Sequence, residues 1–328
     1  METQVNIQPL TWLFSTFDAT YSHNHVTLTR YFEDEYLNNV QVKYPYRFRV
    51  VFEAQSFGAI NDWLAKLTQD CAITPLMRHN DLQGFELAST SALGTLMSQF
   101  PQQVKAELLN ITAPLASLFK PGLLVMDMDS TAIQIECIDE LAVMAGVGEA
   151  VSEVTERAMQ GELDFEESLR LRVSKLAGAN ESIISTLCEQ LPLMPGLKSL
   201  VAELKSNEWK LVLASGGFTP FVGYLKDLLD LDAAYANELV IEAGKLTGEV
   251  TGDVVDAQYK ANVIDKCSAT WQIAAGQRLA IGDGANDIPM VNAADFGIAF
   301  HAKPKLLAAA DASINNLDLR CLVYYLQA

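Results

Sequence analysis

Short apolar runs that end in aspartate, serine or glycine recur in the second part of the chain. Residues 123–126, 210–214 and 279–281 are such runs, and we expect residues 296–300 to be a fourth. Segments with apolar residues at helical spacing separate them. Strands that are apolar on both faces and alternate with helices predict a parallel sheet covered on both sides. Ligands bind at the carboxyl ends of such strands, so the residues after each run are the functional candidates.

The composition supports two folded domains and argues against several functions. The 328 residues are half hydrophobic, with 23 basic and 41 acidic residues and a net charge of −18. This balance argues against a nucleic-acid binder and against attraction to an anionic membrane. No apolar run is long enough to span a bilayer, and the first residues do not resemble a signal peptide. With five scattered cysteines that fit free thiols, these features predict a cytoplasmic protein.

The first 118 residues have a different pattern from the rest. They carry 7 basic and 11 acidic residues, against 16 and 30 in residues 119–328. Alternating or helically spaced apolar residues predict three strands and two helices, in the order strand, helix, strand, strand, helix, at residues 46–52, 60–67, 71–76, 84–87 and 89–100. We expect a small α+β domain over residues 1–118. It carries no chemical motif, and two roles stay open: regulation, or dimerisation with a second copy of the chain.

Two aspartates, Asp127 and Asp129, follow the first apolar run, and Ser130 comes next. On an extended segment two carboxylates at this spacing point to the same side. Like charges this close repel each other unless a cation, a proton or a substrate group shares the site. The alternative is a helix start that is capped by Asp129 or Ser130.

Three further candidates follow the first motif along the chain. Ser215 and Gly216 come directly after the second run, where a hydroxyl and glycine amides suit a phosphate, although a tight turn needs no function. Lys260 lies near a predicted helix start, where a lysine is usually a solvated charge. The turn after the third run holds Asp283, Asn286 and Asp287, oxygen ligands of the kind that suit Mg²⁺, unless the turn is purely structural.

The four motifs, in this order, resemble those of the haloacid dehalogenase superfamily over about residues 120–315. The runs Asp127-Met128-Asp129-Ser130-Thr131 and Gly282-Asp283-Gly284-Ala285-Asn286-Asp287-Ile288-Pro289-Met290 are similar in particular to those of the members that hydrolyse phosphoserine. The resemblance implies an α/β fold, a three-layer Rossmann-like parallel sheet with an inserted helical cap, preceded by the α+β domain. We expect this phosphatase domain over residues 119–328, with the cap at about 138–205. Its candidate helices are residues 138–145, 151–160, 165–177 and 181–189.

The resemblance also implies roles for the core residues. Asp127 would be the nucleophile that forms an aspartyl-phosphate, and Asp129 would protonate the leaving oxygen and later deprotonate water. The implied cofactor is Mg²⁺, held by Asp127, by the backbone carbonyl of Asp129 and by Asp283. Asn286 and Asp287 would complete or orient its ligand shell. Phosphate oxygens would be bound by Ser215, Gly216 and Lys260.

Four residues, Glu136 just before the predicted cap and three within it, match family positions that contact the substrate. Glu136 matches the position that binds the amino group, and Arg172 matches the arginine that binds the carboxylate. Met159 and Phe165 match apolar positions around the substrate. The implied reaction is Mg²⁺-dependent hydrolysis of O-phospho-L-serine to L-serine and phosphate, the last step of serine biosynthesis. Without the resemblance, Arg172 lies on a helix with an ordinary apolar stripe.

Two other functions stay open. A phosphotransferase, a mutase or a phosphatase for another small phosphorylated metabolite would start from the same Asp127. A receiver domain, phosphorylated on an aspartate for signalling, is the non-enzymatic alternative. The helical insertion and the second acid at Asp129 argue against a receiver. Residues 237–250 alternate weakly, as in a hairpin beside the sheet, and we expect them to carry no chemistry.

Overall fold

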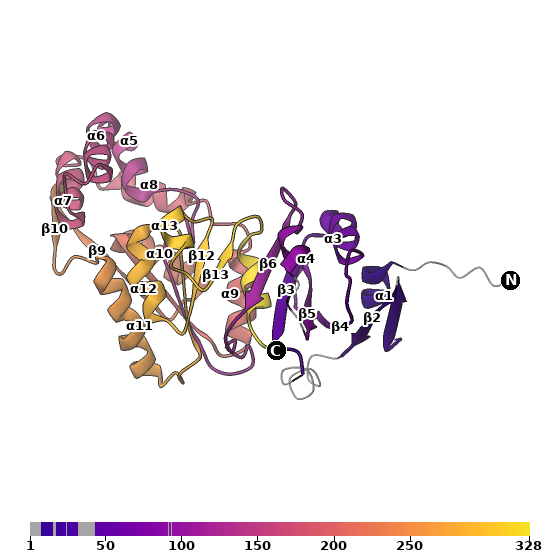
Figure 1. Cartoon of the computed structure of the whole chain (residues 1–328). Coiled ribbons are helices and arrows are strands. Elements are labelled where there is room, and N and C mark those ends of the chain that lie inside the picture. The colour runs from indigo at the N-terminus through magenta and orange to yellow at the C-terminus, as the bar shows by residue number, and fades with distance from the viewer. Residues whose placement is uncertain (1–7, 16–17, 24, 32–42, 91, 93) are drawn as a thin grey trace. The chain divides into compact units, whose positions relative to one another are not determined.

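The computed structural model describes residues 8–15, 18–23, 25–31, 43–90, 92 and 94–328, except for the side chains of residues 95, 96 and 159. The chain divides into two compact units, Met1–Phe119 together with Ile314–Ala328, and Lys120–Ser313. Figure 1 colours both units along the chain. None of the helices in the described part of the chain is long and apolar enough to cross a membrane.

The second unit is built on a seven-stranded sheet with the order β10-β9-β8-β7-β11-β12-β13. The central strands β8, β7, β11 and β12 are parallel, as predicted, and β8 also pairs in parallel with β9. β9 and β10 form an antiparallel hairpin over the segment expected to be one. The strands are β7 Leu123–Met126, β8 Lys210–Phe218, β9 Ala233–Glu242, β10 Lys245–Thr251, β11 Arg278–Gly282, β12 Phe296–Phe300 and β13 Ala312–Ile314.

Helices cover both faces of this sheet. One face packs against α11, α12 and α13 in a core that includes Val125, Val212, Ile264, Met290 and Leu306. Strand residues of the opposite parity are equally buried, and helices α9 and α10 contact β8. The helices are α9 Leu197–Ser206, α10 Thr219–Leu229, α11 Ala257–Trp271, α12 Ile288–Ala293 and α13 Pro304–Leu307. The predicted α/β sandwich with a parallel sheet is therefore confirmed.

Five helices lie between β7 and β8. The first four correspond to the four that the sequence predicts, whereas α9, which was not predicted, packs against β8. The first four gather at one end of the second unit (Figure 1). α7 begins at a capping box in which the Asp164 side chain accepts from the Glu167 amide and the Glu167 side chain accepts from the Asp164 amide. These four helices are α5 Cys137–Met144, α6 Gly148–Met159, α7 Phe165–Lys175 and α8 Ser182–Gln190.

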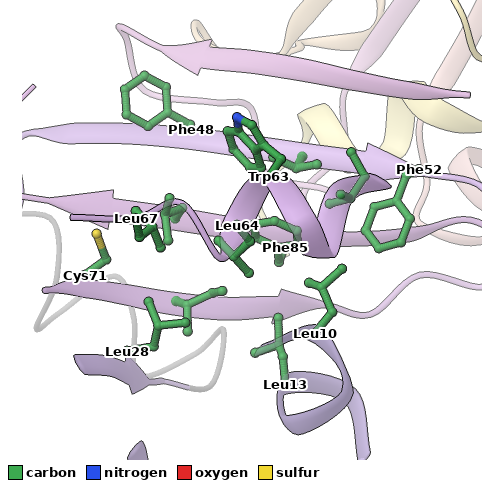
Figure 2. Packing of buried hydrophobic residues seen from close by; sticks show 14 of the residues in the cluster. Leu10, Leu13, Leu28, Phe48, Phe52, Trp63, Leu64, Leu67, Cys71 and Phe85 are labelled. Atoms are coloured by element: carbon green, nitrogen blue, oxygen red, sulfur yellow. The ribbon is translucent and has the colours of Figure 1, made fainter. Parts of the chain in front are cut away.

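The first unit has a six-stranded sheet with the order β1-β2-β4-β5-β3-β6. Helices α1 (Pro9–Ser15) and α3 (Phe57–Leu64) pack on the sheet around Leu10, Trp63 and Phe85 (Figure 2). The predicted strands are present, but β1, β2 and β6 were not predicted. The expected helix over 89–100 is shorter, because β5 continues to Ser89 and α4 covers only Gly94–Ser98. The strands are β1 Thr20–His23, β2 Val26–Arg30, β3 Tyr46–Phe52, β4 Cys71–Leu76, β5 Gln83–Ser89 and β6 Ala106–Ile111.

Two arginines of β3 are buried with one glutamate of β5. Arg49 lies directly opposite Glu86, and the Nε atoms of Arg47 and Arg49 lie 2.6 and 2.8 Å from its two carboxylate oxygens. The Nη1 atom of Arg49 donates to the carbonyl oxygens of Tyr324 and Leu326, both at 2.7 Å. A fully buried guanidinium needs several acceptors, and the last residues of the chain supply two of them.

The C-terminal segment thus belongs to the first unit and not to the expected domain over residues 119–328. η3 (Leu319–Tyr325) contacts β3, and all of its residues except Arg320 are buried. The alternation of arginines with apolar residues in β3 correctly indicates a strand. It gives no sign, however, that the arginine face is covered by residues distant in sequence.

Replacing Glu86 by glutamine should destabilise the first unit. The variant leaves two buried guanidinium groups without a carboxylate, a defect of about 3–5 kcal/mol for a broken buried pair. Urea unfolding followed by tryptophan fluorescence measures the loss. The matched control is Glu166→Gln, which breaks the exposed Arg170–Glu166 pair and should change stability by less than about 0.5 kcal/mol. Equal losses in the two variants would contradict the assigned role of Glu86.

Glu86 also makes the stability of the fold depend on pH in the acid range. Burial alone would raise the pKa of Glu86, but Arg49 and Arg47 outweigh burial and hold this pKa below its ordinary value. The carboxylate therefore stabilises the folded state above the ordinary pKa of a glutamate, and this contribution is lost as the pH falls through the lowered pKa. Glu86→Gln should show a weaker decline of stability in acid than the unmodified chain.

Candidate active site

The predicted functional residues meet at the carboxyl ends of β8, β7 and β11, which are neighbours in the sheet. A cavity of about 90 Å³ opens there, between the strand ends and the helices inserted after β7. Its walls combine acids, one arginine, a glycine-rich turn and aromatic rings. The predicted site residues that line it are Asp127, Asp129, Glu136, Phe165, Arg172, Ser215, Gly216 and Asn286.

Three carboxylates cluster at the base of the site. Asp127, Asp283 and Asp287 each offer an oxygen, and these atoms lie within 4.8 Å of one another. The Nζ atom of Lys260 lies 2.8 Å from Oδ1 of Asp127 and 2.8 Å from Oδ1 of Asp287. Lys260 is 1% exposed, so it is not the solvated charge of the alternative, and its role in binding phosphate stays a prediction. One ammonium group leaves excess negative charge among three acids, which a divalent cation would balance.

Burial and mutual repulsion shift the ionisation of this cluster. Burial first, and then the charge of Asp287, raises the pKa of Asp127 well above its ordinary range. Burial, Asp287 and Glu136 raise the pKa of Asp283 to about 6. Burial opposes the charge of Lys260, but Asp127 and Asp287 outweigh it and raise its pKa. The donor set consists of hard oxygen atoms and fits Mg²⁺.

Asp287 organises the turn after β11. Its Oδ2 atom accepts from the amides of Asp283 and Gly284, both at 3.1 Å, while Oδ1 accepts from Lys260. A methyl group on Gly282 would overlap the Asp287 carboxylate, so the turn requires glycine at that position. The sequence predicts Asp287 as a residue that completes or orients a metal shell. In the structure, its carboxylate accepts hydrogen bonds from two amides of the turn and from the ammonium group of Lys260.

Asp129 lies beside the glycine-rich turn and faces the inserted helices. Its Oδ1 atom accepts from the amide of Cys137 at 3.3 Å. Burial and the charge of Glu136 raise its pKa to about 7. A carboxyl group with such a pKa can both hold and release a proton at neutral pH. α5 begins at Cys137 with Glu136 as its N-cap residue, so neither Asp129 nor Ser130 is the helix cap of the structural alternative.

Ser215 and the two glycines after it form the opposite wall. Ser215 is buried, and its Oγ atom accepts from the amide of Gly217 at 2.9 Å. A Cβ atom on Gly216 would lie 2.9 Å from Cζ of Phe165, so the first residue of α7 closes directly over the turn. Hydroxyl and amide donors thus border the same cavity as Asp127.

Arg172 and Glu136 bring opposite charges to the side of the cavity formed by the inserted helices. Burial lowers the pKa of Arg172, and the nearby carboxylates of Asp139, Glu136 and Asp129 oppose that shift. Glu136 accepts from the hydroxyl of Ser130 at 2.9 Å. Met159, the other apolar candidate, ends α6, and its side chain lies outside the described part of the structure.

Lys303 and Asn237 are among the residues near the site that were not predicted. Lys303 lines a hollow of about 770 Å³ that shares Phe165, Arg172 and Asn286 with the cavity, and its charge lowers the pKa of Asp283. Asn237 of β9 donates to the backbone of the glycine-rich turn. Asparagine is depleted in strands, so its presence in a strand-like segment was the one available signal.

A family model described as haloacid dehalogenase-like hydrolase matches residues 122–295, more than half of the chain. The chain belongs to this family. Phosphoserine phosphatase of Vibrio cholerae is 57% identical over 211 residues, which cover 64% of this chain and 64% of that protein. Phosphoserine phosphatase of Idiomarina loihiensis is 49% identical over 198 residues, 60% of this chain and 90% of that protein. The aligned part therefore spans just under two thirds of the Vibrio cholerae relative.

Solved structures agree with these relatives. A crystal structure of a probable phosphoserine phosphatase from Vibrio cholerae has a TM-score of 0.72 at 44% identity and covers 85% of this chain and 86% of that one. A substrate-bound phosphoserine phosphatase complex has a TM-score of 0.60 at 39% identity, with 63% of this chain and 99% of that one covered. The predicted family is confirmed.

Replacing Gly282 by alanine should disrupt the site from beneath. The new methyl group displaces Asp287 from the amides of Asp283 and Gly284, which leaves buried polar groups unsatisfied at a cost of about 1–3 kcal/mol each. Thermal unfolding measures the loss of stability. Gly223→Ala is the matched control: Gly223 lies within α10 with open space around it, so alanine should be neutral or stabilise by up to about 1 kcal/mol. A Gly282→Ala variant as stable as Gly223→Ala would contradict this packing.

Proposed function

We propose that the chain hydrolyses O-phospho-L-serine to L-serine and phosphate with Mg²⁺ as cofactor, through an aspartyl-phosphate intermediate. The observation that carries the proposal is a single cavity lined by Asp127 on one side and by Glu136 and Arg172 on the other. Asp127 in turn lies in one cluster with Asp283, Asp287 and Lys260. This cluster suits a phosphoryl group, and the opposite charges of Glu136 and Arg172 suit the ammonium and carboxylate of an amino acid. The relatives named phosphoserine phosphatase support the same substrate.

Asp127 acts as the nucleophile. Bonds from the amide of Met128 and from Lys260 to its Oδ1 atom fix the rotation of the carboxylate. An oxygen of Asp127 attacks phosphorus as the bond from phosphorus to the serine oxygen breaks, and Asp129 gives that oxygen its proton. Water then attacks phosphorus of the aspartyl-phosphate while Asp129 takes a proton from this water, and breaking the acyl-phosphate P–O bond regenerates Asp127 and releases phosphate.

The metal would be held by Asp127, by the backbone carbonyl of Asp129 and by Asp283. When bound, Mg²⁺ reduces the repulsion between a carboxylate nucleophile and a phosphate dianion. Asp287 orients this set through its bonds to the Asp283 amide and to Lys260. Asn286, which lines the cavity, completes or orients the metal ligands.

Ser215, the amide of Gly216 and Lys260 bind the phosphate oxygens. Donors aimed at the position where charge develops are the largest single contribution in many enzymes. The cap side selects the rest of the substrate: Glu136 pairs with the ammonium group and Arg172 with the carboxylate, while Phe165 and Met159 pack against it. The planar fork of an arginine suits a carboxylate in a bidentate geometry.

The first unit contributes none of these residues. Its regulatory or dimerisation role, a homodimeric assembly and a cytoplasmic location stay predictions from the sequence.

Replacing Asp127 by asparagine should lower kcat on phosphoserine by about 10³-fold or more, because the variant lacks the nucleophile. Phosphate release measures the rate, and an unchanged circular dichroism spectrum shows that the fold is kept. Asp265→Asn is the control, since Asp265 lies on α11 with its side chain 75% exposed, and its activity should be unchanged. Near-normal turnover by Asp127→Asn would exclude Asp127 as the nucleophile.

Replacing Arg172 by alanine should change substrate preference. The loss of a charge-assisted bond worth about 1.5–3 kcal/mol should raise KM for phosphoserine roughly 10- to 150-fold. For phosphoethanolamine, which has the ammonium group but no carboxylate, KM should rise far less. Arg170→Ala, on the same helix in an exposed pair with Glu166, should affect neither substrate. Equal losses on the two substrates in Arg172→Ala would remove Arg172 from carboxylate recognition.

A further inference from the structure

Near its carboxyl end, β8 contains more residues than the segment of β9 with which it pairs. β8 and β9 pair up to Ala214 opposite Tyr235 and pair again at Phe218 opposite Asn237. β8 thus has two more residues than β9 over this interval, and the bulge holds the turn of Ser215, Gly216 and Gly217. A bulge leaves backbone groups without ladder partners. Because buried carbonyl groups are costly without a partner, something else must bond them.

Asn237 supplies the missing partner. Its Nδ2 atom donates to the carbonyl oxygen of Gly216 at 2.8 Å and to that of Gly217 at 3.2 Å. Its Oδ1 atom accepts from the amide of Val255 at 2.8 Å. The side chain is 1% exposed and is absent from the residues that line the cavity. Asn237 therefore lies behind the turn and is not in contact with the space where a substrate would bind.

The hydrogen bonds of Asn237 also fix the direction of the donor groups on the cavity side of the turn. The carbonyl and amide groups of a trans peptide point in opposite directions, and the described residues contain no cis peptide. A bond from Asn237 to the Gly216 carbonyl therefore turns the Gly217 amide away from Asn237, and this amide donates to Oγ of Ser215 at 2.9 Å. Because Oγ accepts there, the hydroxyl proton of Ser215 is left to donate to a phosphate oxygen.

The bond to Val255 connects the turn to the helix that carries Lys260. Val255 precedes Asp256, whose side chain accepts from the Tyr259 amide at 2.7 Å and begins α11. Lys260 lies in the first turn of that helix, and its amide donates to the Asp256 carbonyl. One buried side chain thus joins the segment of Ser215 and Gly216 to the start of the helix of Lys260.

We propose that Asn237 is a positioning residue that aims the phosphate-binding groups Ser215, Gly216 and Lys260, an inference that rests on the proposed function of this site. It acts on the phosphoryl group and not on the amino-acid part of the substrate. Its loss therefore impairs every phosphate ester to the same degree, in contrast to the loss of Arg172.

The test compares Asn237→Asp and Asn237→Ala in the full chain, with Mg²⁺, on phosphoserine and on 4-nitrophenyl phosphate. Aspartate keeps the acceptor for Val255 and lacks the donor for the glycine carbonyls. In both variants kcat/KM should fall by about 10- to 100-fold, and by the same factor on both substrates. This is the range of about 10- to 100-fold found for residues that orient metal ligands without touching the metal. Inhibition by inorganic phosphate should weaken in parallel.

Asp232→Ala is the matched control for stability. The Asp232 side chain accepts from the Leu211 amide at 2.9 Å at the opposite end of β8, so its loss also removes a bond between the two strands. This variant should have a lower thermal midpoint and unchanged kcat/KM. Asn237 variants with a lower thermal midpoint but unchanged kcat/KM, as expected for Asp232→Ala, would overturn the proposal. If Asn237→Ala is too unstable to assay, Asn237→Asp, which has the same shape, decides.

The substrate proposal and the positioning proposal fail separately. A chain that hydrolyses 4-nitrophenyl phosphate but not phosphoserine overturns the proposed substrate, and the Asn237 comparison proceeds on the first ester. A chain that hydrolyses neither overturns the proposed function. Calorimetric titration with inorganic phosphate in the presence of Mg²⁺ then decides the positioning role: weaker binding in Asn237→Asp supports it, and unchanged binding overturns it.

Discussion

The contact of Lys260 with two buried carboxylates is the interaction on which the site depends. Asp127, Asp283 and Asp287 come from two strand ends, and the lysine comes from α11, so the cluster fixes the relative positions of three chain segments. Three acids within 4.8 Å of one another are tolerable only with compensating positive charge. One lysine supplies part of it, and a divalent cation would balance the rest.

The charged groups of the sheet and those of the inserted helices are proposed to bind different parts of the substrate. In the proposed function, groups at the strand ends bind the phosphoryl group, which all phosphate esters share. Glu136 and Arg172 lie on the helical side of the cavity and would bind the part that differs between esters. Phe165 closes over Gly216, so the two sets of groups meet across a cavity of about 90 Å³.

The sequence predicts the parts of the molecule that depend on local pattern. Continuous apolar runs locate β7, β8, β11 and β12, and the polar residues after them locate most of the site. Local pattern does not reveal contacts between segments that are distant in sequence. The burial of Lys260 depends on Asp127 and Asp287, which lie far from it in sequence. Asn237 gains its role from a two-residue bulge in the neighbouring strand, and Arg49 gains its acceptors from residues 324 and 326.

The pairing of Arg49 with the Tyr324 and Leu326 carbonyls makes the first unit discontinuous in sequence. The second unit, Lys120–Ser313, is an insertion between two segments that fold together. During synthesis the strands of the first unit emerge from the ribosome before the second unit, yet they acquire the last acceptors for Arg49 only after it. The order in which the two units are completed is therefore the reverse of the order in which they begin.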